Sequence, residues 1–254
     1  MLRWEAAIAT DNPRILYRAV QLLKKLGIDF VICTPTDSRC DNAHVVITNY
    51  LEGLEHHTGR IQVEEDFDTD FVRIALISKL REVQNPTRAF IGIDPGMTFG
   101  LALVIDGVPV YQNSLAKPSN IAELVQRLQR YTRQLFPKCS IVTRVGTGSK
   151  LYTALVLRIL VLKIPEQELE MVNEHRTTIR GGPKSNESSA ILIAGRTGRP
   201  MKSADMILEL KEGYIQSVKQ YITQLSRGKR IVSRSEARAL LLGEISIDEL
   251  ISTP

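Results

Sequence analysis

Short apolar runs that alternate with amphipathic stretches are the feature of this sequence that most restricts its fold. A short continuous apolar run predicts a buried strand, whereas apolar residues at intervals of three or four predict a helix that covers a sheet. Both patterns recur along most of the 254 residues. This alternation predicts an α/β protein, and the length allows more than one domain.

The composition excludes several classes of protein. Hydrophobic residues make up 43% of the chain and charged residues 24%, and the mean hydropathy is −0.06, as is typical of globular rather than disordered or collagenous chains. No segment approaches the ~20 apolar residues that a membrane-spanning helix needs. The first residues also lack the pattern of a signal peptide. We therefore expect a cytoplasmic protein with no membrane partner.

The three cysteines predict neither a disulfide framework nor a zinc site. They are few and scattered, and no two of them stand in a Cys-x-x-Cys pair. Cys33 and Cys139 lie beside apolar runs, where we expect them in the core. The four histidines lack the ligand spacing of a zinc site.

Charge is distributed unevenly along the chain. Residues 1–85 carry 10 Lys and Arg against 13 Asp and Glu, a net charge of −3. Residues 86–254 carry 23 against 15, a net charge of +8, so a nucleic acid would bind to this second part. Solvated basic helices are an alternative explanation, because excess charge also keeps a protein soluble.

Residues 1–85 are expected to form a small acidic α/β domain. The helix predicted over 13–25 is followed by Gly27, a residue typical of helix ends, and its apolar side would cover a small parallel sheet. The strands are predicted at 6–9, 30–33 and 45–47. The acidic stretch 64–70 precedes a second helical pattern, which ends at Leu80. We expect these acids to cap the helix rather than to bind a cation, because the helix dipole favours negative charge there.

The turn signal Asn85-Pro86 marks the expected domain boundary. Beyond it, three strands form a predicted meander with a hairpin turn at Asp106-Gly107, and alternating helices and strands follow. The strands are predicted at 90–94, 100–105, 108–114, 141–143 and 169–172, and the helices at 120–135, 151–162 and 186–195. Residues 86–200 therefore predict a domain of the order βββαβαβα. Residues 201–254 predict a helical extension, with helices at 205–226, 235–242 and 247–251.

Asp94 is the clearest candidate for a residue with a chemical role. It ends a predicted buried strand and precedes the turn Pro95-Gly96. A carboxylate in such a place is costly to bury without compensation, and a divalent cation with oxygen ligands compensates it. Alternatively, Asp94 belongs to a plain turn and accepts hydrogen bonds from backbone amides.

Three stretches, in this order, resemble the RNase H-like superfamily and, within it, the RuvC resolvases and the YqgF-type proteins. The stretch 91–100 (IGIDPGMTFG) resembles the first-strand motif of that group. The stretch 172–178 (VNEHRTT) resembles the acidic signature of YqgF-type proteins, and 186–194 (NESSAILIA) resembles the final helix. The resemblance covers residues 88 to about 198 and implies an RNase H-like mixed sheet between the small α/β domain and the helical extension.

The resemblance implies a metal-dependent endonuclease that acts on structured DNA or RNA, as in Holliday-junction resolution or ribosomal RNA processing. Its carboxylates would hold two Mg²⁺ or Mn²⁺ ions about 4 Å apart, which activate a water and stabilise the leaving oxygen. The catalytic and metal-binding residues would be Asp94, Glu174 and Glu187. Phosphate contacts would come from Arg176, Thr177, Thr178, Arg180 and Lys184. The resemblance to resolvases also implies a homodimer.

Departures from the family pattern keep a second interpretation open. Asn186 and Ser189 stand where the relatives have aspartate, and Arg144 stands near the place of an expected glutamate. Glu187 lies one position out of register, ~100° around the helix, and also fits a first-turn acid that interacts with the helix dipole. The alternative is a catalytically degenerate RNase H-like module that binds nucleic acid or a protein partner without cleavage. The first-strand turn also resembles that of the actin-like ATPases, but the second phosphate motif of those proteins is absent from the sequence.

Overall fold

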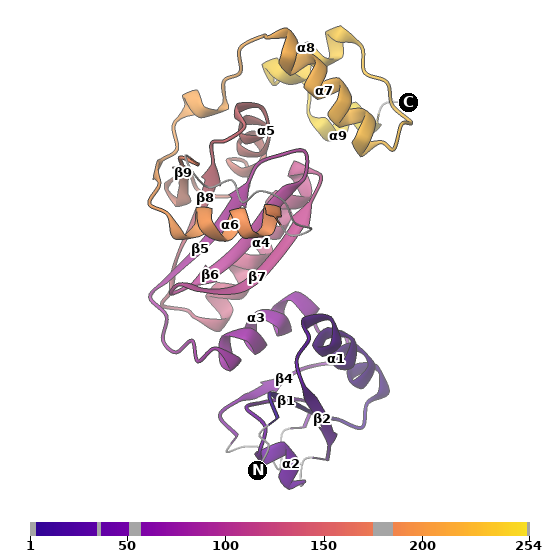
Figure 1. The fold of residues 1–254 in the computed structure, drawn as a ribbon, viewed down its shortest axis with the longest axis vertical. Helices are drawn as coiled ribbons and strands as arrows, with labels where there is room; N and C mark the ends of the chain where they lie inside the picture. Colours follow the sequence, from indigo (N-terminus) through magenta and orange to yellow (C-terminus); the bar gives the residue numbers. More distant parts are fainter. Residues whose placement is uncertain (1–3, 35–36, 51–56, 175–184, 253–254) are drawn as a thin grey trace. The chain divides into compact units, whose positions relative to one another are not determined.

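A computed structural model describes residues 4–34, 37–50, 57–174 and 185–252. The chain divides into two compact units (Figure 1). The N-terminal unit comprises residues 1–87 and 131–139, and the C-terminal unit comprises residues 88–130 and 140–254. The segments 88–130 and 140–200 and the helical extension therefore belong to one unit.

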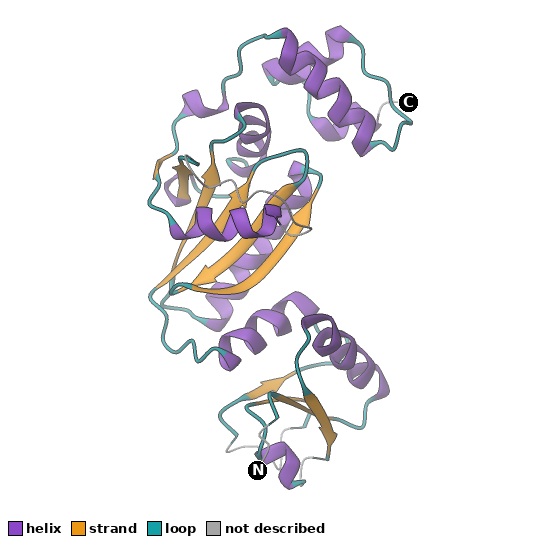
Figure 2. Ribbon diagram, in the orientation of Figure 1, coloured by secondary structure: helices purple, strands orange, loops and turns teal. Residues whose placement is uncertain are grey.

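Four parallel strands form the sheet of the N-terminal unit, in the order β2-β1-β3-β4. They are β1 (Ala6–Ala9), β2 (Phe30–Cys33), β3 (Val45–Thr48) and β4 (Arg60–Gln62). The helices α1 (Pro13–Leu26), α2 (Ser38–Asp41) and α3 (Thr69–Leu80) accompany them (Figure 2). The predicted α/β arrangement with a parallel sheet is confirmed. The sequence pattern does not predict β4, because a strand of three residues is too short to show a period.

Both faces of this sheet are covered. On one face, Ile8 and Ile47 pack with Ile15 and Leu23 of α1 and with Val72 of α3. The other face holds a smaller cluster of Ala7, Ala9, Cys33, Cys40, Ala43 and Val46. Successive residues of β1 therefore face opposite sides and all are buried, as is typical of a parallel strand between two layers.

Local signals define both ends of α1. The Asn12 side chain accepts hydrogen bonds from the backbone N–H groups of Arg14 and Ile15. Pro13 occupies the first turn, where a backbone N–H would have no hydrogen-bond acceptor within the helix, so the absence of an N–H in proline costs nothing there. Gly27 ends the helix in the left-handed conformation, with φ at +67°. The predicted helix is confirmed and is one residue longer than expected.

The acidic stretch before α3 supplies the predicted cap. The Asp68 Oδ1 atom accepts hydrogen bonds from the backbone N–H groups of Asp70, at 2.8 Å, and Phe71, at 3.4 Å. Its Oδ2 atom accepts a hydrogen bond of 2.5 Å from the Tyr131 hydroxyl. The capping interpretation is confirmed for Asp68.

The expectation that the cysteines are too scattered to pair is wrong for two of them. Cys33, at the end of β2, is joined by a disulfide to Cys40 in α2, whereas the buried Cys139 is not disulfide-bonded. The two partners are seven residues apart, and the fold brings their Cα atoms to 6.1 Å, within the usual range for a disulfide. Sequence spacing does not reveal this pairing, because it depends on where β2 and α2 lie in space.

A six-stranded mixed sheet forms the centre of the C-terminal unit, in the order β10-β9-β8-β5-β6-β7. The strands β5 (Arg88–Asp94), β6 (Phe99–Ile105) and β7 (Val108–Leu115) form the predicted antiparallel meander. On the other side of β5, β8 (Ser140–Gly146) and β9 (Leu169–Val172) run parallel to it, and β10 (Arg199–Pro200) is antiparallel to β9. The carboxyl ends of β5, β8 and β9 therefore lie at one edge of the sheet.

Helices lie on both faces of this sheet. In Figure 1, α6 (Ser185–Gly195) crosses the front of the sheet, where it contacts β5 to β8, and α4 (Pro118–Leu135) lies behind the sheet. α5 (Lys150–Leu160) and a short 3-10 turn, η1 (Glu166–Glu168), connect β8 to β9. The observed elements β5-β6-β7-α4-β8-α5-β9-α6 follow the predicted order.

The strongly apolar helix α5 is buried within the C-terminal unit. Its buried residues are Leu151, Tyr152, Thr153, Ala154, Leu155, Val156, Leu157 and Leu160. These side chains therefore need no second copy of the chain to cover them. In the described ranges, no helix has both the length and the apolar character needed to cross a membrane.

The first helix of the C-terminal extension is shorter than predicted. The spacing predicts a helix over 205–226, whereas the chain forms a 3-10 turn, η2 (Ser203–Met206), a non-helical segment, 207–211, and then α7 (Glu212–Leu225). The prediction is wrong for this segment because Ile207 and Leu210 do not form a buried face and are 74% and 42% exposed. The later helices α8 (Arg234–Leu242) and α9 (Ile247–Ser252) agree with the prediction to within one residue.

Side-chain hydrogen bonds attach the extension to the rest of the C-terminal unit. The Arg158 guanidinium of α5 donates hydrogen bonds to the carbonyl oxygens of Leu240, at 2.8 Å, and Leu241, at 2.7 Å. These carbonyls end α8, where a helix offers them no internal partner. The Tyr221 hydroxyl of α7 donates a hydrogen bond of 2.5 Å to the Ala116 carbonyl. The extension is therefore packed against the mixed-sheet part of its unit.

Candidate active site

Asp94 lies at the centre of the edge where the parallel strands of the mixed sheet end. It pairs with Gly100 of β6, which in turn pairs with Ser114 of β7. On its other side lies Gly146, the last residue of β8. The carboxyl edge of parallel strands is where α/β proteins commonly bind ligands. Asp94 thus occupies a position suited to a functional carboxylate.

Glu174 extends toward Asp94 from the far side of β8. It follows β9 by two residues, and its Oε1 atom accepts a hydrogen bond of 2.8 Å from the Gly148 backbone N–H. Two glycines leave the space for this carboxylate. A Cβ at Gly146 would lie 1.9 Å from Glu174 Oε1, and one at Gly148 would lie 2.3 Å from Oε2. The carboxylates of Asp94 and Glu174 therefore lie on either side of the end of β8, close enough for the charge of Glu174 to affect Asp94.

The proximity of the two carboxylates changes the acidity of Asp94. Burial, the larger cause, and the negative charge of Glu174 together raise the pKa of Asp94 from its ordinary 3.8 to about 6. A hydrogen bond from the Ser189 hydroxyl acts in the opposite direction, because it stabilises the carboxylate. The site therefore holds two acids that repel each other at neutral pH.

The helix α6 lies directly on β5 and β6 because glycines allow its close approach. A Cβ at Gly92 would lie 2.0 Å from the Ala190 carbonyl oxygen, and one at Gly100 would lie 2.0 Å from the Asn186 carbonyl oxygen. This contact brings Ser189 to Asp94. The Asn186 side chain donates a hydrogen bond of 3.2 Å to the Thr98 carbonyl, which holds the start of α6 over the turn after β5.

Glu187 is held apart from the other two acids. Its Oε1 atom accepts a hydrogen bond of 3.4 Å from the Ser114 hydroxyl of β7. Ser114 is two strands away from Asp94, about 10 Å in the hydrogen-bonding direction. Within the described parts of the chain, no group of three or more His, Cys, Asp and Glu side chains is placed to hold a metal ion. The structure thus brings together Asp94 and Glu174 but does not add Glu187 to them.

Arg144, which stands near the place of an expected glutamate, has a structural role. Its guanidinium donates hydrogen bonds to Glu170, at 2.8 Å, and to the Ala194 carbonyl, at 2.7 Å, near the end of α6. It also lies over the Phe90 ring, 3.7 Å from the centroid. Arg144 therefore fixes the far end of α6 and adds no charge to the carboxylate pair.

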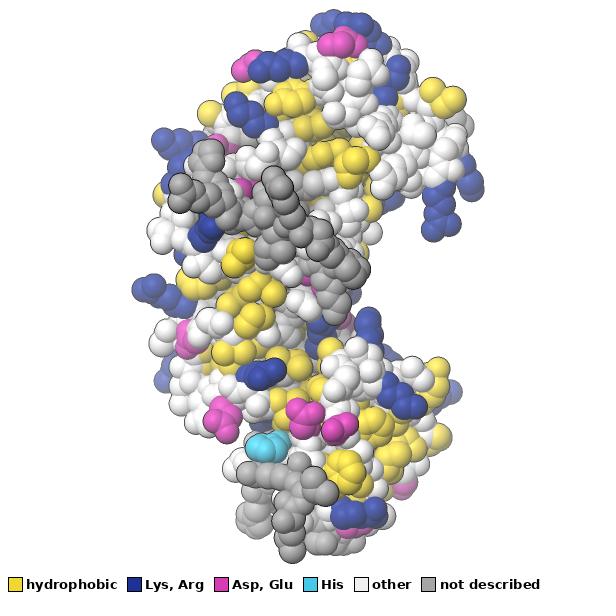
Figure 3. Space-filling model, viewed as in Figure 1, with side chains coloured by type: hydrophobic (Ala, Val, Ile, Leu, Met, Phe, Trp, Pro, Cys, Tyr) yellow, Lys and Arg dark blue, Asp and Glu magenta, His cyan; other side chains and the backbone are white. Residues whose placement is uncertain are grey.

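The expected phosphate-binding residues lie outside the described residues. These are Arg176, Thr177, Thr178, Arg180 and Lys184. Glu174 is the last described residue before that segment. On the face shown in Figure 3, Lys and Arg side chains are spread over several parts of the surface rather than gathered in one patch.

The residues at the site fit one divalent cation. Asp94 and Glu174 offer oxygen atoms, which Mg²⁺ and Mn²⁺ prefer. A cation between them would remove the repulsion that contributes to the raised pKa of Asp94. Gly146, Gly148 and Ser189 complete the site, and sequence reasoning does not assign them this role. The signal for the glycines is present in the sequence, since both closely follow the strand predicted at 141–143.

Comparison with models of protein families and with curated proteins gives no match to this chain.

Proposed function

We propose that the protein is a divalent-metal-dependent endonuclease that acts on structured nucleic acid, DNA or RNA, with an RNase H-like domain in its C-terminal unit. The observation that carries this proposal is the meeting of Asp94 and Glu174 at the carboxyl edge of a mixed sheet. The element order of that unit supports it, since it is the order that the family resemblance implies. The three stretches that resemble RuvC and YqgF-type proteins all lie in this unit.

The chain's own residues prepare a cation site with fixed ligands. Asp94 and Glu174 would hold Mg²⁺ or Mn²⁺, which when bound lowers the pKa of a water and polarises a phosphoryl oxygen. The Ser189 hydroxyl orients the Asp94 carboxylate by a hydrogen bond. The Gly148 backbone N–H orients Glu174 in the same way. Both ligands are thereby positioned before a substrate binds, which lowers the reorganisation that catalysis requires.

Cleavage assays with the full chain test the proposal. Labelled four-way junctions, duplexes and single strands of DNA and RNA are incubated with Mg²⁺ or Mn²⁺, and binding is scored in the same experiment. We expect metal-dependent cleavage that Asp94→Asn abolishes. Asp106→Asn is the matched control, because Asp106 lies in the hairpin turn at the other end of β5 and β6. Absence of cleavage of every substrate by the wild type would contradict an endonuclease.

A second candidate function is a nucleic-acid-binding module that does not cleave. It is favoured by the placement of Glu187, which bonds to Ser114 instead of joining Asp94 and Glu174. Asn186 also supplies no charge where the family has an acid. Binding without cleavage that is unchanged by Asp94→Asn would support this module. Metal-dependent cleavage would exclude it.

A further inference from the structure

A cavity lies beside the carboxylate pair, outside the ends of β8 and β9. Its volume is about 710 Å³, within the range of about 300–1,000 Å³ that small-ligand sites occupy. Its lining residues are Thr147, Lys150, Thr153, Met171, Asn173, Thr197, Gly198, Arg199, Ala204, Asp205 and Ile207. All of these belong to the C-terminal unit. The function proposed above does not use this cavity.

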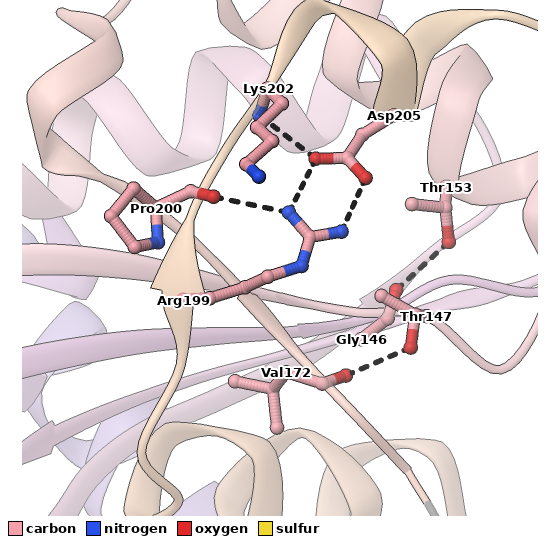
Figure 4. A network of polar contacts seen from close by, with 8 residues as sticks. All are labelled: Gly146, Thr147, Thr153, Val172, Arg199, Pro200, Lys202 and Asp205. Carbon is pink, nitrogen blue, oxygen red and sulfur yellow. Dashed lines mark hydrogen bonds and ion pairs between the residues drawn. The ribbon is translucent and has the colours of Figure 1, made fainter.

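Part of the cavity wall is held in place by hydrogen bonds (Figure 4). The Arg199 guanidinium donates to both Asp205 carboxylate oxygens, at 2.8 and 2.5 Å, and the Lys202 backbone N–H donates to Asp205 Oδ2 at 2.8 Å. Opposite them, the Thr147 hydroxyl donates to the Val172 carbonyl at 3.2 Å. These contacts order each side of the cavity by itself, and the Met201 backbone N–H, which donates to the Leu169 carbonyl at 3.1 Å, holds the segment that follows β10 against β9. The cavity is therefore pre-formed.

The charges of the lining favour a ligand with a single negative group. Arg199 and Asp205 neutralise each other, and this pairing lowers the pKa of Asp205 and raises that of Arg199. Lys150 supplies the remaining cation of the lining. Lys150 is exposed, and the nearby Glu209 carboxylate is bonded to Lys211, which is the main cause of the lowered pKa of Glu209. A phosphate monoester or diester is an anion that one ammonium group can bind.

The uncharged lining favours a flat ring with polar edges. Met171, Ala204 and Ile207 are apolar, and Ile207 is 74% exposed on a non-helical segment at the cavity. Thr197 and Asn173 offer hydroxyl and amide groups, which both donate and accept hydrogen bonds. Apolar surface for a ring face together with such groups for its edges is how proteins hold nucleobases.

The cavity adjoins the candidate cation site through the backbone. Thr147, in the lining, precedes Gly148, whose N–H binds the Glu174 carboxylate. Asn173, also in the lining, precedes Glu174 itself. A ligand in the cavity therefore lies next to the group that would hold the cation.

We propose that this cavity binds one nucleotide unit, a base with its sugar and phosphate, which is unstacked from a nucleic-acid strand beside the phosphodiester at Asp94 and Glu174. Lys150 contacts its phosphate, and the exposed side chains of Ile207 and Ala204 contact the face of its base. The inference rests on the proposed function for the identity of the strand, but the binding itself needs neither the cation nor cleavage.

Calorimetric titration of the full chain with AMP and UMP, in buffer with EDTA, tests the binding. We expect binding that weakens by about tenfold in Lys150→Glu, because a charge-assisted contact is lost and a repulsion is added. Ile207→Ser is expected to weaken binding by about fivefold, through loss of apolar contact with the base. Lys229→Glu, the same charge change at an exposed site outside the lining, is expected to leave the affinity unchanged. Equal binding by Lys150→Glu and Lys229→Glu, or no binding by the wild type, would overturn the proposal.

Competition distinguishes a free nucleotide from a nucleotide within a strand. A single-stranded oligonucleotide of about ten nucleotides is expected to displace AMP, and to do so less well from Lys150→Glu. If mononucleotides bind but the oligonucleotide does not displace them, the strand interpretation is overturned. Cleavage without nucleotide binding would overturn the cavity proposal alone. Specific nucleotide binding without cleavage of any substrate would leave the cavity proposal standing and overturn the endonuclease.

Discussion

At the scale of the residue, the candidate site depends on two glycines as much as on its two carboxylates. Gly146 and Gly148 have no Cβ, and the Glu174 carboxylate occupies the space that a side chain would fill. Asp94 is thereby exposed to a second negative charge in a partly buried place. Such a pair is unfavourable for folding, and proteins retain strain of this kind mainly at functional sites.

Asp94→Asn is expected to stabilise the protein at neutral pH in the absence of divalent cations. The pKa of Asp94 is about 6 in the folded chain and near 3.8 when unperturbed, so the folded state binds more protons between these values. The free energy of unfolding of the wild type therefore falls as the pH rises from about 4 to about 6. The shift corresponds to roughly 3 kcal/mol, which solvent screening of the partly exposed carboxyl reduces to about 1–2 kcal/mol.

Thermal unfolding of both proteins in EDTA, across this pH range, measures the effect. The stability difference between Asp94→Asn and the wild type should grow as the pH rises. Asp106→Asn should show no such trend. A difference that is constant with pH would mean that Asp94 titrates as an ordinary carboxyl.

Gly148→Ala is expected to separate the two carboxylates at little cost in stability. The three atoms nearest to the new Cβ would all belong to the Glu174 carboxylate, and the nearest of them, Oε2, would lie at 2.3 Å. Because that carboxylate is the end of a flexible side chain, it will move, and the free energy of unfolding should change by about 0.5 kcal/mol or less. Stabilisation by Mg²⁺, measured as a shift in the unfolding temperature, should be lost.

Gly195→Ala is the control for this substitution, because a Cβ there has no atom within 4 Å. It should keep the full response to Mg²⁺. An undiminished response in Gly148→Ala would show that Glu174 does not bind the cation.

At the scale of the element, the contact of α6 with the sheet is what carries Ser189 to Asp94. Gly92 and Gly100 lie on adjacent strands beneath the helix, where the backbone of α6 approaches too closely for any side chain. At the other end, Arg144 donates a hydrogen bond to the Ala194 carbonyl. The position of α6 is therefore set by glycines in the strands and by one arginine, rather than by a strong apolar stripe of its own.

Gly92→Ala is expected to destabilise the C-terminal unit by about 1–3 kcal/mol, the usual cost of overpacking. Its Cβ would lie 2.0 Å from the Ala190 carbonyl oxygen and 2.7 Å from the Ala194 nitrogen, and these backbone atoms move only if the helix moves. Denaturation by urea, followed by circular dichroism, measures the change. Gly213→Ala in α7 has no atom within 4 Å of its Cβ and should be neutral or stabilising. Equal stability of the two variants would show that α6 does not approach the sheet this closely.

At the scale of the whole molecule, the two compact units are expected to respond to different conditions. The N-terminal unit contains the Cys33–Cys40 disulfide, and the C-terminal unit contains the carboxylate pair. The chain has a single tryptophan, Trp4, which belongs to the N-terminal unit. Tryptophan fluorescence therefore reports on that unit alone.

Reduction of the disulfide is expected to lower the unfolding midpoint detected by Trp4 fluorescence. Opening a loop of seven residues costs about 2 kcal/mol in the chain-entropy description. Mg²⁺ is expected to leave this midpoint unchanged and to raise a second transition, seen by calorimetry, through binding at Asp94 and Glu174. A single transition that responds equally to reductant and to Mg²⁺ would show that the two units unfold together.

The sequence by itself determined most elements and their order. Helix caps and apolar runs act between residues that are close in the chain, so they can be predicted from the sequence. Examples are the caps Asn12 and Asp68 and the helix-ending Gly27. The prediction fails at 207–211, where helical spacing is present but the side chains at Ile207 and Leu210 are not buried. Spacing shows that a helix is compatible with the residues, and only packing decides whether one forms.

The composition of the site was decided by the tertiary structure. Asp94 is recognisable as a candidate from its strand end and Glu174 from the family resemblance, but their proximity depends on the order of β5, β8 and β9 and on the empty space at Gly146 and Gly148. The separation of Glu187 follows from the place of Ser114, two strands away. The Cys33–Cys40 bond and the cavity beside β9 likewise join residues that no local pattern connects. Distances across a sheet are set by strand order and register, and neither is encoded in the neighbourhood of a single residue.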